Sequence, residues 1–171
     1  RQPGSSIKVA TYATAFKQGF SPGTILLDTP VTFLTSDNIP YSPVNYDGKF
    51  HGPITLRTAL GSSYNVPAVK MLSVLGVNRV IETGQSLGIT TWTNSQNYGL
   101  SLTLGGAEIR MIDMMTVYGT LASGGIKHLP QPILTITDSL GNVLEDYRQD
   151  SSGQRVISEE VAYLLTHILS D

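Results

Sequence analysis

The residues best suited to chemistry lie at the start of the chain, where Ser5 precedes Lys8 by three positions. Pro3-Gly4 is a turn signal, and helix-forming residues follow it. Gly4 lets the backbone turn sharply into that helix and places Ser5 at or next to its N-cap. The spacing puts the Lys8 amine over the same helical face as the Ser5 hydroxyl. A lysine whose pKa is lowered by burial can remove the serine proton, so the pair could act as nucleophile and base.

The helix after Ser5 is predicted to be buried. Apolar side chains cover most of its circumference: Ile7, Val9, Ala10, Tyr12, Ala13, Ala15 and Phe16. A helix that is apolar nearly all round is an interior helix, and a buried lysine in its first turn is rare unless it is paired or functional. The free N–H groups of the helix start would also favour the anionic states of an acyl transfer. The ordinary alternative is an N-cap serine followed by a solvated lysine.

A serine nucleophile of this kind also needs a group that passes a proton to the leaving amine, and a polar contact for the substrate amide. A Ser-x-Asn turn between helices can supply both, because alternate residues of an extended turn point the same way. The chain has three such tripeptides, Ser36-Asp37-Asn38, Ser63-Tyr64-Asn65 and Ser95-Gln96-Asn97. We select Ser63-Tyr64-Asn65 because it lies between two predicted helices, whereas Ser36-Asp37-Asn38 lies in an irregular loop.

The elements that must position these groups are predicted to be mainly helical. Helical spacing and cap residues predict helices after Ser5 and over residues 55–60, 66–75, 77–87, 111–122 and 161–169, the last opened by Ser158-Glu159-Glu160. Residues 24–33 are predicted to be extended, and residues 133–144 to form a small β-hairpin around Asp138-Ser139-Leu140-Gly141. Residues 35–53 and 90–106 are predicted to be irregular loops.

Composition narrows the class of protein. The chain has 171 residues, a net charge of −2, 14% charged residues and no cysteine. This length suits one domain with a proper core. Without a basic stripe, we expect no nucleic-acid partner. No apolar run reaches membrane-spanning length. His51, His128 and His167 are scattered without metal-ligand spacing, so we expect ordinary surface or core histidines and no metal or organic cofactor.

The residues around Ser63-Tyr64-Asn65 resemble those of a known family. The run Tyr41–Leu60 and its continuation Ser63–Lys70 resemble the approach to the second motif in class A, bifunctional penicillin-binding proteins. Residues 102–109 and 118–125 are similar to later segments of the same family. Its first motif, Pro-Gly-Ser-Ser/Thr-x-Lys, is followed some tens of residues on by Ser-x-Asn. The 58 positions from Ser5 to Ser63 (63 − 5) suit this order, and the 31 to Ser36 are too few.

The resemblance implies an α/β (α+β) fold of the serine β-lactamase and penicillin-binding-protein transpeptidase type. Val9 stands where the family commonly has proline, and the third motif, Lys-Thr-Gly or Lys-Ser-Gly, occurs nowhere. We therefore expect residues 1–171 to be part of one transpeptidase domain, truncated at both ends. These residues would form mainly the helical middle of the domain and a small β-hairpin, and the central sheet of the domain would be largely missing from them.

The function that the resemblance implies is that of a peptidoglycan D,D-transpeptidase. Ser5 would form an acyl-enzyme with the D-Ala-D-Ala donor stem peptide, Lys8 would accept its proton, Ser63 would relay it, and Asn65 would hold the donor amide. The expected partners are the donor stem peptide, an acceptor amine, β-lactam antibiotics and the rest of the same domain. We expect an extracytoplasmic location, with the parent anchored to the membrane by a segment outside this chain. Alternatives are a D,D-carboxypeptidase, a serine β-lactamase, and a non-turnover penicillin-binding sensor or scaffold domain.

Other conspicuous residues are predicted to be structural. Lys70 is expected to form an ion pair or be solvated, and Met111 to Met115 to pack in the core. Gly105-Gly106 is expected to mark a close backbone approach. Trp92 and Tyr98 could line a groove, but we expect an exposed aromatic loop. Glu108, within a segment like the family's Leu-Gly-Gly-x-Glu, is expected to be structural.

Overall fold

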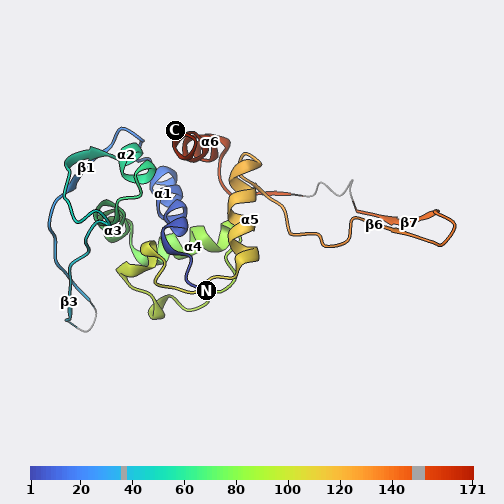
Figure 1. Ribbon diagram of the computed structural model, residues 1–171, viewed down its shortest axis with the longest axis horizontal. Helices are drawn as coiled ribbons and strands as arrows, with labels where there is room; N and C mark the ends of the chain where they lie inside the picture. The colour runs from blue at the N-terminus through green and yellow to red at the C-terminus, as the bar shows by residue number, and fades with distance from the viewer. Residues whose placement is uncertain (36–37, 148–152) are drawn as a thin grey trace.

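A buried helix lies at the centre of the helical part of the molecule, which we describe from a computed structural model covering residues 1–35, 38–147 and 153–171. This helix, α1, contacts α2, α3, α4 and α6, and α5 packs against α4 and α6 (Figure 1). The helices are α1 (Lys8–Lys17), α2 (Leu56–Gly61), α3 (Asn65–Leu75), α4 (Val77–Leu87), α5 (Met111–Ala122) and α6 (Glu159–Leu169), with 3-10 helices η1 (Gly4–Ile7), η2 (Ser95–Asn97) and η3 (Leu100–Leu104).

The burial predicted for α1 is confirmed. Every residue from Lys8 to Phe16 is buried, so neighbouring elements cover the helix on all sides. This follows from its composition, because the small residues at positions 10, 13 and 15 let adjacent helices approach closely while Tyr12 and Phe16 fill the remaining space. The charged Lys8 therefore enters the interior with the apolar residues of its own helix.

The predicted helix boundaries agree with the local capping chemistry. Thr55 caps α2, its hydroxyl oxygen accepting from the Thr58 N–H at 3.1 Å. α4 ends at Gly88, whose φ of 124° a side chain would disfavour. Ser158 caps α6 through the Val161 N–H at 3.4 Å. α3 begins at Asn65, one residue before the predicted start.

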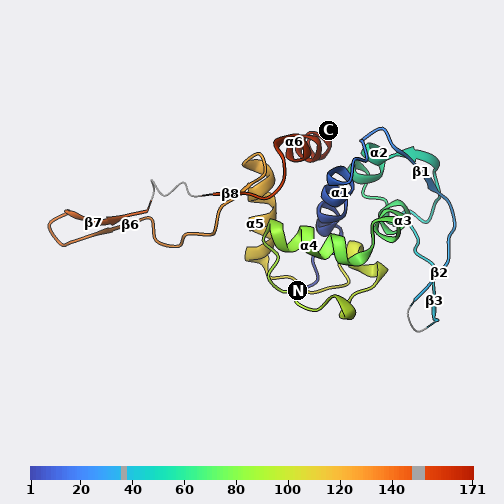
Figure 2. The same ribbon diagram turned by 180° about the vertical axis from the view of Figure 1, so that it is seen from behind.

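Short antiparallel strand pairs accompany the helices in the part of the chain that the structure describes. β1 (Ile25–Asp28) pairs with β4 (Gly52–Thr55), with Ile25 opposite Thr55. β2 (Phe33–Leu34) pairs with β3 (Pro40–Tyr41), β5 (Ile126–Lys127) with β8 (Gln154–Arg155), and β6 (Thr135–Thr137) with β7 (Val143–Asp146). The β6–β7 pair confirms the predicted hairpin, which projects away from the helices in both views (Figures 1 and 2).

The predicted loops are more ordered than the sequence suggested. β3 and the start of β4 lie within residues 35–53. Residues 90–106 contain η2 and η3, and η3 packs against α1 and α3. The predicted extended segment, residues 24–33, is split between β1 and the first residue of β2. The pairing of β1 with β4 brings the chain directly into α2 and so helps to fix the approach to residues 63–65.

Two predictions about apolar side chains are wrong, the first for Trp92 and the second for two of three methionines. Trp92 is buried, with 1% of its surface exposed, because its ring packs over Gly84, where an added Cβ would lie 2.4 Å from the ring. Met111 and Met115 are 77% and 63% exposed and do not pack in the core, whereas Met114 is partly buried and packs against it, as predicted. The buried residues of α5 are Asp113, Val117, Thr120 and Leu121, which lie on another face of the helix.

Candidate active site

The first candidate residue, Ser5, lies in a 3-10 turn at the entrance to α1. Gly4 has a φ of 59°, and η1 begins there with Pro3 as its N-cap residue. Ser5 is thus further into the helix than predicted, because the turn starts one residue earlier. Its carbonyl oxygen accepts from the backbone N–H of Lys8. The Ser5 side chain is exposed and has no hydrogen-bond partner among the residues that the structure describes.

Lys8 is buried with its amine directed at the second candidate motif. Only 1% of its surface is exposed. Nζ donates to the Ser63 carbonyl oxygen, to Ser63 Oγ at 3.1 Å and to Asn65 Oδ1 at 2.8 Å. All three partners are neutral oxygens, so they do not compensate the charge as a carboxylate would. Burial lowers the pKa of Lys8 from 10.5 to about 8.

The three partners of Lys8 differ in what they can do when the amine is neutral. The Ser63 carbonyl and Asn65 Oδ1 can only accept a hydrogen bond, whereas the Ser63 hydroxyl can also donate one. A deprotonated Lys8 could therefore donate to the two acceptors and receive a hydrogen bond from Ser63 Oγ. This geometry gives a direct path for a proton between Lys8 Nζ and Ser63 Oγ. It also fixes the orientation of the Asn65 carboxamide, because Asn65 Nδ2 donates to the Val44 carbonyl at 3.0 Å.

The turn that carries Ser63 has an unusual backbone. Ser63 has a φ of 56°, in the left-handed region that residues with a Cβ seldom occupy. Such conformations cost on the order of 1 kcal/mol and persist where the surroundings hold them in place. The Tyr64 N–H donates to the Ala59 carbonyl at 3.0 Å and the Ser63 N–H to the Leu60 carbonyl at 3.0 Å. The end of α2 therefore fixes this turn from one side.

A residue that sequence reasoning missed fixes the turn from the other side. Asn45 Oδ1 accepts from the backbone N–H groups of Asn65 at 2.9 Å and Val66 at 3.1 Å. These are free N–H groups of the first turn of α3, whose own N-cap residue, Tyr64, makes no side-chain cap. Asn45 thus caps the helix from 20 positions away. Its place within the Tyr41–Leu60 run was the only signal in the sequence, and that run did not indicate a role.

The turn that carries Ser5 is held by a glycine loop and by α5. A Cβ added to Gly105 would lie 2.4 Å from Gly4 N, which confirms the predicted close backbone approach. Tyr118 Oη donates to the Ser6 carbonyl at 2.9 Å. The loop is fastened to α1 by a buried hydrogen bond of 2.8 Å between Thr11 and Thr103. The position of Ser5 therefore depends on residues a hundred positions away.

Of the two remaining candidate tripeptides, the structure describes Ser95-Gln96-Asn97, which does not contact the Lys8 amine. Ser95-Gln96-Asn97 forms η2, which packs on α4. Ser36 and Asp37 lie outside the described residues, so Ser36-Asp37-Asn38 is not placed. Among the described residues, no cluster of three or more His, Asp or Glu side chains is arranged to hold a metal ion.

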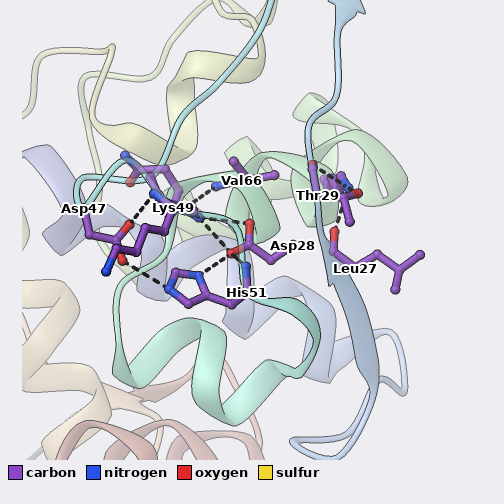
Figure 3. A network of polar contacts seen from close by, with 10 residues as sticks. Leu27, Asp28, Thr29, Asp47, Lys49, His51 and Val66 are labelled. Carbon is purple, nitrogen blue, oxygen red and sulfur yellow. Dashed lines mark hydrogen bonds and ion pairs between the residues drawn. The ribbon is translucent and has the colours of Figure 1, made fainter.

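The other residues predicted to be structural have defined contacts. Lys70 is half-buried, and its amine donates to the Leu27 carbonyl at 2.6 Å and to Thr29 Oγ1 at 3.0 Å, so neutral oxygens stand where an ion-pair partner was expected (Figure 3 labels Leu27 and Thr29). Glu108 has an exposed side chain, and its carbonyl accepts from Thr91 Oγ1 at 2.9 Å. Both contacts join segments distant in sequence.

Comparisons with known proteins place this fold in one family. The chain belongs to the penicillin-binding protein transpeptidase family, whose description, Penicillin binding protein transpeptidase domain, matches residues 1–171. The resemblance to penicillin-binding proteins inferred from the sequence is thereby confirmed, as is the transpeptidase fold.

Individual relatives agree. Penicillin-binding protein 2D of Bacillus subtilis is 36% identical over 99% of this chain, which covers 24% of that protein. The crystal structure of penicillin-binding protein 1A from Haemophilus influenzae has a TM-score of 0.85 at 26% identity, covering 97% of this chain and 29% of that one. The structure of PonA1 from Mycobacterium tuberculosis in complex with penicillin V has a TM-score of 0.79 at 26% identity, and the match covers 95% of this chain and 44% of that one.

The chain therefore spans about a quarter of the length of the curated relative. Across the described residues, no helix is both long enough and apolar enough to cross a membrane.

Proposed function

We propose that this chain is part of a single D,D-transpeptidase domain that continues beyond it, and that it carries Ser5, Lys8, Ser63 and Asn65 as the catalytic and substrate-binding set. One observation carries the proposal, the buried Lys8 amine in contact with Ser63 and Asn65. A fully buried structural lysine would be expected to face a carboxylate, and Lys70, whose amine also contacts neutral oxygens, is only half-buried. The lowered pKa of about 8 gives this amine a useful neutral fraction near neutral pH.

In the proposed reaction, Ser5 Oγ attacks the carbonyl carbon of the penultimate D-Ala of a donor stem peptide. Neutral Lys8 takes the Ser5 proton. The C–N bond to the terminal D-Ala breaks as Ser63 gives its proton to the departing nitrogen and takes from Lys8 the proton that came from Ser5, which leaves Lys8 neutral and Ser63 a hydroxyl again. The donor is then an ester on Ser5, which an acceptor amine attacks to form the cross-link and free the serine. Asn65 holds the donor amide.

The proposal requires the Lys8 amine to reach Ser5 Oγ. The two residues are one turn apart, and the Lys8 N–H already donates to the Ser5 carbonyl. In the proposed reaction the Lys8 amine, on a side chain with four rotatable bonds, turns from the Ser63 carbonyl toward Ser5. The Ser5 backbone N–H would form half of an oxyanion hole.

β-Lactams are the second class of ligand that we propose. Their amide would acylate Ser5 in place of D-Ala-D-Ala, and the structure of PonA1 in complex with penicillin V is that of a relative with a β-lactam bound. The donor stem peptide and the acceptor amine of the proposed reaction belong to the peptidoglycan of the cell wall, so we propose that the site faces the extracytoplasmic side of the membrane. A D,D-carboxypeptidase or a serine β-lactamase would form the same ester and transfer it to water. Product analysis with and without an acceptor amine distinguishes these reactions.

The proposal is tested by labelling the complete transpeptidase domain that contains this chain with fluorescent penicillin. Ser6 provides a matched control, because it is the adjacent serine and its hydroxyl donates to the Pro3 carbonyl at 2.7 Å. We expect Ser5→Ala to abolish covalent labelling and Ser6→Ala to retain it. Undiminished labelling of Ser5→Ala would refute the assignment of the nucleophile.

A further inference from the structure

We propose that Asn45, oriented by the buried carboxylate of Asp28, is a positioning residue that holds Ser63 and Asn65 against Lys8. This inference rests on the proposed function, because it takes those residues as the working set. Three segments meet at Asn45: the end of β1, the loop before β4 and the start of α3. Figure 3 shows the contacts between them.

Asn45 is buried, with 3% of its surface exposed, and every polar atom of its side chain has a partner. Oδ1 accepts from the N–H groups of Asn65 and Val66. Nδ2 donates to Asp28 Oδ1 at 3.0 Å, to Asp28 Oδ2 at 2.8 Å and to the Lys49 carbonyl at 2.8 Å. One side chain thus connects the end of β1 with the first residue of α3.

Asp28 decides which way the Asn45 carboxamide points. Its carboxylate can only accept hydrogen bonds when ionised, and it is fully buried. It therefore requires Nδ2 on its side, which leaves Oδ1 facing α3. The opposite orientation would set an oxygen against the carboxylate and an NH₂ group against the N–H groups of Asn65 and Val66. Both contacts would then be repulsive in the interior, where unpaired polar groups are costly.

His51 extends this network to the middle residue of the Ser63-Tyr64-Asn65 turn. Its Nδ1 lies 2.6 Å from Asp28 Oδ2 and its Nε2 lies 3.1 Å from Asp47 Oδ2. The backbone N–H of His51 also donates to Asp28 Oδ2 at 3.0 Å. The ring so fixed stacks on Tyr64, with 4.0 Å between centroids and 20° between planes. The network thus contacts the turn through its backbone at Asn65 and through the Tyr64 ring.

The network reaches the lysine in a continuous series of contacts. Asp28 orients Asn45, Asn45 holds the Asn65 backbone, and Asn65 Oδ1 accepts from Lys8 Nζ at 2.8 Å. Because Asn65 Nδ2 also donates to the Val44 carbonyl, next to Asn45, a shift of Asn45 would move both ends of the Asn65 side chain. A displacement of about 1 Å at such a site can slow a reaction on the order of 10²-fold.

The variant that tests this role is Asn45→Asp in the complete transpeptidase domain. It preserves side-chain size and the acceptor for Asn65 and Val66 but replaces the Nδ2 donor with an oxygen opposite Asp28. Asn142→Asp is the matched control, because Asn142 Nδ2 also donates to a carboxylate, Asp138 Oδ2 at 2.7 Å, in the exposed hairpin far from the site. The double variant D28N/N45D exchanges donor and acceptor and should restore part of the contact.

The readouts separate positioning from stability. Circular dichroism identifies a temperature at which all variants are folded. At this temperature we would measure two quantities separately, the acylation rate at saturating penicillin and the dissociation constant of the non-covalent complex. We expect Asn45→Asp to lower the acylation rate on the order of 10²-fold, Asn142→Asp to leave it unchanged, and D28N/N45D to recover part of the loss. Amide exchange at Asn65 and Val66 should be faster in Asn45→Asp alone.

A folded Asn45→Asp domain that acylates at the wild-type rate would overturn the inference, and so would equal losses in Asn45→Asp and Asn142→Asp. If Asn45→Asp does not fold, the milder variant Asp28→Asn tests the inference, because it removes the charge that orients Asn45. An unchanged acylation rate in Asp28→Asn would then overturn the inference. Labelling of Ser5→Ala would instead refute the proposed function. The amide exchange at Asn65 and Val66 would still decide whether Asn45 holds the turn.

Discussion

The buried Lys8 amine leads to a quantitative prediction about pH. With a pKa of about 8, about one tenth of the amine is neutral at pH 7, whereas a lysine with a pKa of 10.5 would be about 300-fold less deprotonated. If the neutral amine removes the Ser5 proton, the acylation rate should rise about tenfold per pH unit below 8 and level off above it. The lowered pKa comes from burial, so the profile tests the geometry of the site directly.

The perturbation is Lys8→Arg, which keeps a long cationic side chain but cannot lose its proton at accessible pH. We expect acylation by penicillin to fall on the order of 10²- to 10⁴-fold, the range for loss of a general base, and its rise toward pH 8 to disappear. Stopped-flow measurement of the acyl-enzyme between pH 6 and 9 provides the assay, with Ser5→Ala as the blank. A flat wild-type profile, or a Lys8→Arg rate within a few-fold of wild type, would refute the reasoning.

Three further predictions concern stability and packing. Lys8→Met should have a larger free energy of unfolding than wild type below pH 8, because the buried charge of Lys8 disfavours folding there by about 3 kcal/mol. This difference in stability should shrink between pH 8 and 10.5, where wild-type Lys8 is neutral in the folded state and charged in the unfolded state. Denaturant titrations in which the difference stays constant over this range would exclude a lowered pKa of Lys8. Gly105→Ala should lower the free energy of unfolding by about 1–3 kcal/mol and slow acylation, because its Cβ would meet Gly4 N; wild-type stability and rate together would contradict the close approach. Trp92→Ala should lower the free energy of unfolding by about 3–5 kcal/mol, and Met115→Ala should lower it by less than about 0.5 kcal/mol. Equal decreases in melting temperature would contradict the burial of Trp92 and the exposure of Met115.

The sequence predicted the elements whose signals are local. Gly88 ends α4 and Ser158 begins α6 where the sequence placed these boundaries, because a cap depends on the φ preference of one residue or on a hydroxyl three positions from its partner. The burial of α1 could also be read from the sequence, because a helix that is apolar on every side has no face to turn toward water.

Features that depend on distant partners could not be predicted in this way. The burial of Trp92 depends on Gly84, on a different element, and the exposure of Met111 depends on which face of α5 its neighbours cover. Asn45 sits in a segment that reads as a polar loop, and its role needs the end of β1 and the start of α3 to meet there. The choice of Ser63-Tyr64-Asn65 came from its position between helices and from family order, since tripeptide composition alone does not distinguish it.

The assignment of Ser5 as nucleophile is tested most directly by locating the penicillin adduct in the complete transpeptidase domain. Trypsin should release residues 2–8 as one peptide, and residues 58–70, which contain Ser63, as another. Fragment-ion mass spectrometry of the first can distinguish Ser5 from Ser6. We predict a stoichiometric penicilloyl adduct on Ser5. An adduct on Ser6 or Ser63, or none while the folded domain binds penicillin, would contradict the account.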